Sequence, residues 1–179
     1  MKTPLIYGLY MALGSLLLNL ALYFTGFHSD VEKLGTAQTI SSIGGLALGI
    51  AFIVLGTKAR RAEIPVTEDF GYGRAFLTGV QISLFACLFA IVTNILYMNV
   101  VNSGLRELMV QAQINKWEAA GLSSDRIEQA EKMMRKMMSP VMQAVFGVIF
   151  GMIFTTLISL VTAAFLKRPA VTAQPPVAA

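Results

Sequence analysis

Methionines are the residues whose spacing most directly suggests a chemistry. The chain has ten of them, and five lie close together at Met133, Met134, Met137, Met138 and Met142. Thioethers at positions i and i+4 lie on one face of a helix, and soft sulfur ligands of this kind can bind Cu(I). No histidine or cysteine accompanies them, and methionine often fills irregular apolar contacts. We therefore expect apolar packing and predict no metal-binding or cofactor-binding residues, with Cu(I) binding as the alternative.

The single histidine, His28, is the other residue with an obvious chemical use. General acid–base catalysis would require a partner within hydrogen-bonding distance, and the nearby Asp30 and Glu32 are typical of solvated loops. The glycine-containing segment 70–74 resembles a phosphate-binding loop only superficially, because no strand precedes it. No serine–histidine–aspartate set is evident. We therefore predict that the protein is not an enzyme and has no catalytic residues.

Four segments without any charged residue occupy more than half of the chain, at 3–27, 34–57, 75–105 and 137–166. A hydrocarbon core about 30 Å thick requires roughly 20 apolar residues in a helix that crosses it. The mean hydropathy of +0.65 also lies outside the range of soluble domains. The chain is therefore predicted to be an all-α integral membrane protein. Its four-helix bundle should have spans at about residues 4–26, 36–57, 75–102 and 140–166.

Basic residues near the ends of the spans predict the orientation. Those expected on one side of the membrane are Lys2, Lys58, Arg60, Arg61, Arg74, Lys167 and Arg168. The other side has Lys33 and a segment in which six basic residues nearly balance five acidic ones. Cytoplasmic loops are enriched in lysine and arginine. We therefore expect a multi-pass membrane protein with both termini in the cytoplasm. The first span is too long for the apolar region of a cleavable signal and should be retained.

Residues 103–138 are predicted to form a helical hairpin outside the membrane. The i, i+3, i+4, i+7 spacing of one helical face is found at Leu105, Leu108, Met109 and Ala112. Gly121 marks a turn, and Ser124 is expected to be the N-cap of a second, amphipathic helix. Ser139 and Pro140 are the residue types of an N-cap and a first helical position, so the fourth span should begin there.

Small residues recur at every fourth position along three of the spans. These ladders are Ala37, Ser41, Gly45 and Gly49 in the second span, Ala75, Gly79, Ser83 and Cys87 in the third, and Gly147, Gly151, Thr155, Ser159 and Ala163 in the fourth. Small residues let helices approach closely in lipid, so we expect packing within the bundle, with contact to a second copy as the alternative. Leucine at Gly147 or Gly151 should then separate the helices, whereas leucine at Val148 or Ile149 should be neutral.

The spans also contain uncharged amides, at Asn19, Gln81, Asn94 and Asn99. An ion or proton path would be expected to contain an ionisable residue at membrane depth, and the spans contain no Asp, Glu, Lys, Arg or His. Asn19 and Asn94 are therefore predicted to form hydrogen bonds between helices. A passive pore for a neutral solute is the alternative that stays open.

The order of these features resembles that of a known family. The second span ends in the basic cluster 56–61, and the third begins with the aromatic segment 70–76. A Met- and Glu-rich extramembrane segment follows, then Pro140, and the basic pair 167–168 ends the fourth span. This order is similar to that of the bacterial four-span membrane family known as domain of unknown function 4199. The resemblance reaches to about Pro169. The resemblance implies a multi-pass protein of the bacterial inner (cytoplasmic) membrane. It supplies no catalytic residues, because the family has no established activity.

These features together predict a non-enzymatic membrane protein that serves in packing, as a scaffold, or in partner binding. Four spans leave no room for a soluble domain, so we expect one domain over residues 1–168 and a disordered tail over 169–179. The expected partners are the lipid bilayer and a second copy or another membrane protein. No run of basic and aromatic residues suggests nucleic acid. A small transporter or channel, with methionine-bound Cu(I) as its most concrete form, is the alternative function.

Overall fold

The computed structural model describes residues 2–171, and most of them are helical. Its elements are α1 (Lys2–Phe24), α2 (Leu34–Glu63), α3 (Tyr72–Leu96), the π-helix η1 (Tyr97–Val101), α4 (Leu105–Ala119), α5 (Ser124–Met137) and α6 (Pro140–Leu166). Within this described part of the chain, four helices are long and apolar enough to cross a membrane, namely α1, α2, α6 and the continuous helix of α3 and η1. The predicted all-α fold with four long apolar helices and a helical hairpin between the third and fourth is confirmed.

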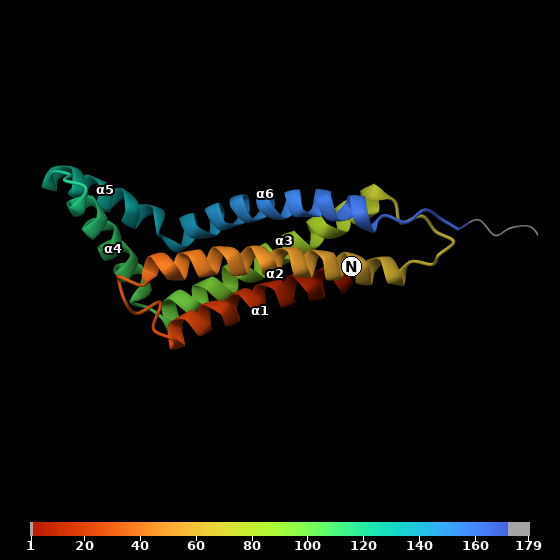
Figure 1. The fold of residues 1–179 in the computed structure, drawn as a ribbon, viewed down its shortest axis with the longest axis horizontal. Coiled ribbons are helices and arrows are strands. Elements are labelled where there is room, and N and C mark those ends of the chain that lie inside the picture. Colours follow the sequence, from red (N-terminus) through yellow and green to blue (C-terminus); the bar gives the residue numbers. More distant parts are fainter. Residues whose placement is uncertain (1, 172–179) are drawn as a thin grey trace, which may run out of the picture.

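Helix α3 lies at the centre of the bundle. Helices α1 and α6 both pack along it, and α2 packs mainly on α1, whereas α1 and α6 hardly touch one another. The four long helices lie lengthwise, and α4 and α5 extend beyond them at one end (Figure 1). We call this the hairpin end. The opposite end, which holds the start of α1, the α2–α3 loop and the segment after α6, is called the terminal end.

The helix boundaries differ from the predicted ones where polar residues continue a helix. Helix α2 continues to Glu63, past the predicted end of the span at residue 57, and an Arg60–Glu63 ion pair at 2.6 Å bridges its last turn. Helix α6 begins at Pro140 as predicted, and the Ser139 side chain accepts a hydrogen bond from the amide of Met142 at 3.4 Å. The predicted N-cap at Ser124 is wrong by one residue, since Ser123 has the extended backbone of the N-cap and Ser124 is already helical.

Polar contacts connect the segment after α6 to the α2–α3 loop at the terminal end. The backbones of Phe70 and Arg168 pair as a single antiparallel bridge, with N–H to O distances of 2.9 and 2.8 Å. The guanidinium of Arg168 donates to the carbonyls of Ile64 and Pro65, each at 2.9 Å. The amide of Val171 donates to Val66 in the same loop. The chain therefore keeps defined contacts to Val171, and the remainder of the predicted tail, 172–179, lies outside the described residues.

The small-residue ladders are helix contacts along only part of their length. In α6, Thr155, Ser159 and Ala163 are buried, and a Cβ atom at Gly79 of α3 would lie 2.5 Å from the Ser159 hydroxyl oxygen. A Cβ atom at Gly147 would meet nothing within 4 Å. Our expectation that leucine at Gly147 would separate the helices is therefore wrong, because Gly147 faces a hollow between α6 and its neighbours.

Candidate functional site

A cavity of about 340 Å³ lies between α1, α3 and α6 in the hairpin half of the bundle. The end of the cavity nearer the hairpin is polar, with Asn19, Asn94, Tyr97 and Gln143 in its wall. The deeper end is mostly apolar and extends past Met11, Ala86 and Gly151. No Asp, Glu, Lys, Arg or His is among the residues that line it. The cavity therefore suits an uncharged group at one end and an apolar group at the other.

A side-chain hydrogen bond between α3 and α6 borders this cavity. The side-chain amide of Asn94 donates to the side-chain oxygen of Gln143 at 3.3 Å, and Gln143 in turn donates to the carbonyl of Met138 at 3.0 Å. The predicted interhelical bond of Asn94 is therefore present. The prediction for Asn19 is wrong, because its side chain donates to the Ser15 carbonyl in its own helix at 3.0 Å.

His28 is buried at the hairpin end of the bundle instead of lying in a solvated loop. Its side chain is 7% exposed, and its Nδ1 lies 2.6 Å from the hydroxyl of Tyr97. That hydroxyl also donates to the carbonyl of Asn19 at 3.2 Å, and the Asn102 side chain donates to the carbonyl of His28 at 3.1 Å. Because a hydroxyl has one proton, Nδ1–H of His28 donates when Tyr97 donates to Asn19. Burial lowers the pKa of His28.

The π-helix η1 positions the partners of His28. Tyr97 is its first residue, and the amide of Asn102 donates to the Tyr97 carbonyl at 2.8 Å, an i to i+5 bond. Single π-turns occur frequently at functional sites. The wide turn brings Tyr97 and Asn102 against the α1–α2 loop, and Tyr97 is also part of the cavity wall. The buried cluster of His28, Tyr97 and Asn102 therefore connects the loop to the cavity.

Sequence reasoning missed this cluster because the partners are far apart in the chain. His28 and Tyr97 are separated by 69 positions. The nearer residue Asp30 does not contact the imidazole; it accepts a hydrogen bond from the amide of Glu32 and lies 3.5 Å from Lys33. Neither a histidine in a short loop nor a tyrosine at the end of an apolar segment predicts such a contact. The only available signal was the polar character of Asn102 and Tyr97 near the end of a span.

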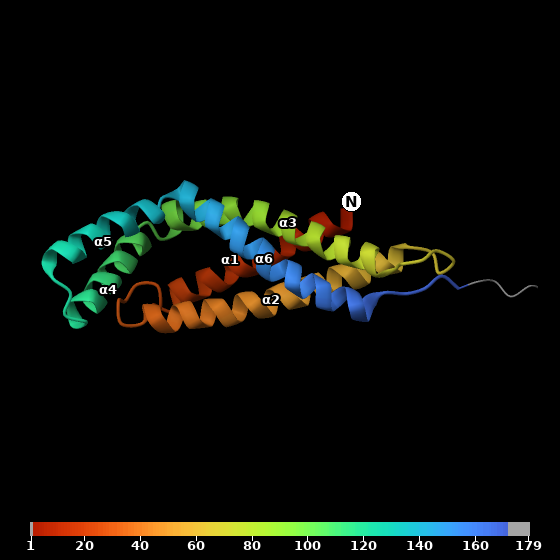
Figure 2. The ribbon, with the colours of Figure 1, turned by 90° about the horizontal axis from the view of Figure 1, so that it is seen from above.

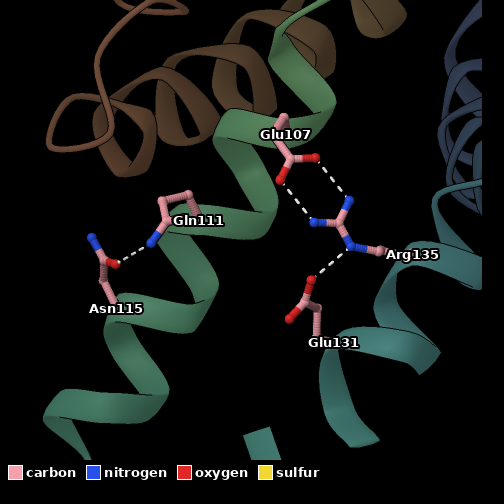
Figure 3. A network of polar contacts seen from close by, with 5 residues as sticks. All are labelled: Glu107, Gln111, Asn115, Glu131 and Arg135. Carbon is pink, nitrogen blue, oxygen red and sulfur yellow. Dashed lines mark hydrogen bonds and ion pairs between the residues drawn. The ribbon is translucent and has the colours of Figure 1, made fainter. Parts of the chain in front are cut away.

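An ion-pair network joins the two helices of the hairpin. The guanidinium of Arg135 in α5 donates to both carboxylate oxygens of Glu107 in α4, each at 2.7 Å, and its Nε donates to Glu131 at 2.7 Å (Figure 3). The bidentate geometry is the strong form of this contact. The Arg135 guanidinium lowers the pKa of Glu107. The contact fixes the two hairpin helices relative to one another near the base of the hairpin.

The methionines of α5 line a second hollow, which we call the methionine groove. It has a volume of about 690 Å³ and lies between the hairpin and the first turns of α6. Its wall is formed by Asn94, Gln113, Trp117, Ala130, Met133, Met134, Met137, Met138, Gln143 and Phe146. Met133 is 67% and Met137 50% exposed, whereas Met138 is only 8% exposed. The structure thus brings four of the five clustered methionines to one groove and leaves two of them largely uncovered.

The fold and these two hollows define the class of protein. It is an α-helical bundle with the four apolar helices of a multi-pass membrane protein, a polar cavity among three of them and a helical hairpin beyond the bundle. The chain belongs to the family described as Protein of unknown function (DUF4199), whose sequence profile matches residues 6–168. The family predicted from the order of features is therefore confirmed. Neither a curated protein nor a solved structure matches the chain.

Proposed function

We propose that this is a non-enzymatic protein of the bacterial inner membrane that binds another membrane protein through the methionine groove. The observation that carries the proposal is the exposure of Met133 and Met137 in a large groove beside the bundle. Methionine adapts to apolar partners of irregular shape and is common at binding surfaces. A hydrophobic groove of this kind accepts the apolar face of an amphipathic helix. The Arg135–Glu107 contact supports the role by keeping the groove preformed.

The surroundings of His28 support a binding role over an enzymatic one. Its contacts are a tyrosine hydroxyl and an asparagine side chain, neither of which is a carboxylate or an activated nucleophile. Catalysis of acyl or proton transfer generally requires such groups close to the histidine. The pair of His28 and Tyr97 instead joins the α1–α2 loop to η1. We therefore assign it to the stability of the hairpin end.

The proposed orientation places both termini in the cytoplasm, and it makes a direct prediction. On a Cys87→Ala background, Ser29→Cys should react with a membrane-impermeant maleimide in intact spheroplasts, and Ala62→Cys only after permeabilisation. Both positions are exposed in the structure, and the reason for the orientation is the basic cluster around Arg60 and Arg61. The reverse labelling would contradict the orientation. Labelling of both positions from outside would contradict the number of spans.

The methionine groove makes the next prediction, by site-specific photo-crosslinking. A photoreactive phenylalanine analogue at Met133 or Met137 should crosslink to another membrane protein in native membranes. The same analogue at Lys132, which is exposed on the opposite face of α5, should not. A Met133→Glu change should abolish the crosslink formed at Met137, because a charge in an apolar contact is costly. Equal crosslinking at Lys132, or a product with the mass of two copies of this chain, would contradict the proposed partner.

Cu(I) binding is the second candidate, and the shared groove of Met133, Met134, Met137 and Met138 favours it. Changing all four to leucine separates the two functions, since leucine keeps the apolar surface and removes the thioether ligands. With the probe placed at Trp117, crosslinking should survive this change if the partner is a protein. Stoichiometric Cu(I) on purified wild-type protein that is lost in the four-leucine variant, together with loss of crosslinking, would favour the transporter alternative.

A further inference from the structure

The cavity between α1, α3 and α6 has no role in the proposed binding of a protein partner, and its shape points to a different ligand. Helices α2 and α6 diverge toward the hairpin end when the bundle is seen from above (Figure 2). Near the middle of the bundle α2 still contacts both α1 and α6. A Cβ atom at Gly49 of α2 would lie 3.6 Å from Met11 in α1 and 3.6 Å from Ile158 in α6. Beyond that point no residue of α2 lines the cavity. The cavity is therefore open at the side of the bundle, toward the hydrocarbon layer.

Glycines keep the α6 wall of this cavity thin. Gly147 lines the cavity, and a Cβ atom there would have no neighbour within 4 Å. Gly151 is next along the wall, where a Cβ atom would lie 3.1 Å from the sulfur of Cys87. A larger side chain at Gly147 would point into open space, so the glycine is not required there by helix packing. It leaves room for a ligand.

Three hydroxyl groups in the cavity wall already donate their protons to backbone carbonyls. Ser15 donates to the carbonyl of Met11 at 3.1 Å, Thr93 to that of Ala90 at 3.2 Å, and Thr155 to that of Gly151 at 2.7 Å. Each bond lies within one helix. A hydroxyl oxygen that donates its only proton to the backbone still has lone pairs to accept a hydrogen bond. These three side chains therefore offer acceptors, and no donors, to the cavity.

The orientation of the amides adds two further acceptors. The nitrogen of Asn19 must face the Ser15 carbonyl, so its Oδ1 is left for another partner. Gln143 must direct its nitrogen to the Met138 carbonyl, so its oxygen accepts from the Asn94 nitrogen and the Oδ1 of Asn94 is left over. The remaining N–H groups of these amides can still donate. The wall as a whole thus suits a head group that both donates and accepts hydrogen bonds, as a hydroxyl does.

We propose that this cavity binds an uncharged lipid with a hydroxyl-bearing head, of the acylglycerol class. The hydroxyls of the head lie among the oxygens of Asn19, Thr93 and Asn94, and the acyl chain follows the apolar wall toward Gly151 and leaves at the side opening. Anionic heads have no counter-charge here. Arg106 borders a separate small hollow that also touches Asn94 and Gln143. A quinone head, which only accepts hydrogen bonds, would leave the oxygens of the wall without donors.

The proposal is tested with three oleoyl compounds on the purified full-length protein in detergent. In native mass spectrometry with titration, 1-monooleoylglycerol should bind saturably with one molecule per chain. Methyl oleate, which lacks hydroxyls, should bind about tenfold more weakly, as expected from the loss of one or two net hydrogen bonds. Equal binding of the two would overturn the proposed head-group specificity. Tighter binding of oleate than of the glycerol ester would assign the ligand to Arg106 and overturn the proposal as well.

Two leucine variants locate the bound lipid. Gly147→Leu should reduce binding of 1-monooleoylglycerol at least tenfold by filling the cavity, while its melting temperature stays at or slightly above that of the wild type. Ile149→Leu changes a neighbouring side chain that is 48% exposed and not part of the cavity wall, so it should bind normally. Unchanged binding to Gly147→Leu, or no binding of any of the compounds to the wild type, would overturn the proposal. Met133→Glu, in the methionine groove, should leave lipid binding unchanged.

Discussion

Leucine in place of Gly8 is expected to destabilise the bundle by about 1–3 kcal/mol, the range found for overpacked sites. A Cβ atom at Gly8 of α1 would lie 2.6 Å from the Cβ of Phe85 and 2.9 Å from the backbone nitrogen of Ala86 and the backbone oxygen of Ile82. These atoms belong to the main chain of α3 or are fixed to it, so no side-chain rotation relieves the clash. Helices α1 and α3 would have to separate along their contact.

The same substitution at Gly147 is the matched control, because both glycines are in helix interiors. Leucine favours the helix over glycine by up to about 1 kcal/mol at either site. Thermal unfolding in one detergent should therefore leave Gly147→Leu at or slightly above the wild-type melting temperature and Gly8→Leu clearly below it. Similar melting temperatures of the two variants would show that the backbones of α1 and α3 are farther apart than in this structure. Gly45→Leu, also in open space, provides a second control in α2.

These glycines indicate how far the packing could be predicted from the sequence. The charge-free segments specify four membrane-spanning helices because no other structure satisfies the backbone in lipid without closing a barrel. The spacing of small residues predicts which positions can form contacts, but Gly147 and Thr155 belong to the same ladder and only Thr155 is buried. Whether α6 stays beside α2 depends on the whole bundle. The contact at Gly8 was missed, although Pro4, Gly8 and Ala12 also have the spacing of four.

The hairpin was predictable for a different reason. Residue spacing, a glycine turn and the pair Ser139–Pro140 are local signals, and each lies where it was expected, within one residue. Gly121 has a positive φ of 73°, which suits glycine at the turn. The methionine groove was only partly predictable. Its methionines are neighbours in sequence, but Trp117 and Phe146, which complete the wall, come from α4 and α6.

The buried cluster of His28, Tyr97 and Asn102 could not be predicted from the sequence. It gives the second large predicted effect. Changing Tyr97 to phenylalanine should lower the free energy of unfolding by about 1–3 kcal/mol, because the buried Nδ1 of His28 then has no hydrogen-bond partner. Phenylalanine keeps the ring in place. Tyr10→Phe, which removes the hydroxyl from a ring that is 49% exposed, is the matched control. Unfolding in detergent at pH 7.5 measures both. A Tyr97→Phe variant as stable as the wild type would contradict the assigned hydrogen bond.

The pKa of His28 adds a pH dependence whose sign follows from its burial. Burial lowers the pKa in the folded state, so the unfolded chain, with a histidine pKa of about 6.5, binds the proton more readily. Stability is therefore fully present above that value and is lost as the pH falls toward the lower folded pKa. The melting temperature of the wild type should decrease between about pH 7.5 and pH 5.5. His28→Gln, which keeps every other charged residue, should be less stable at pH 7.5 and should lose much of this decrease. If the melting temperatures of the wild type and His28→Gln decrease in parallel over this pH range, the fold does not hold the imidazole in its neutral form.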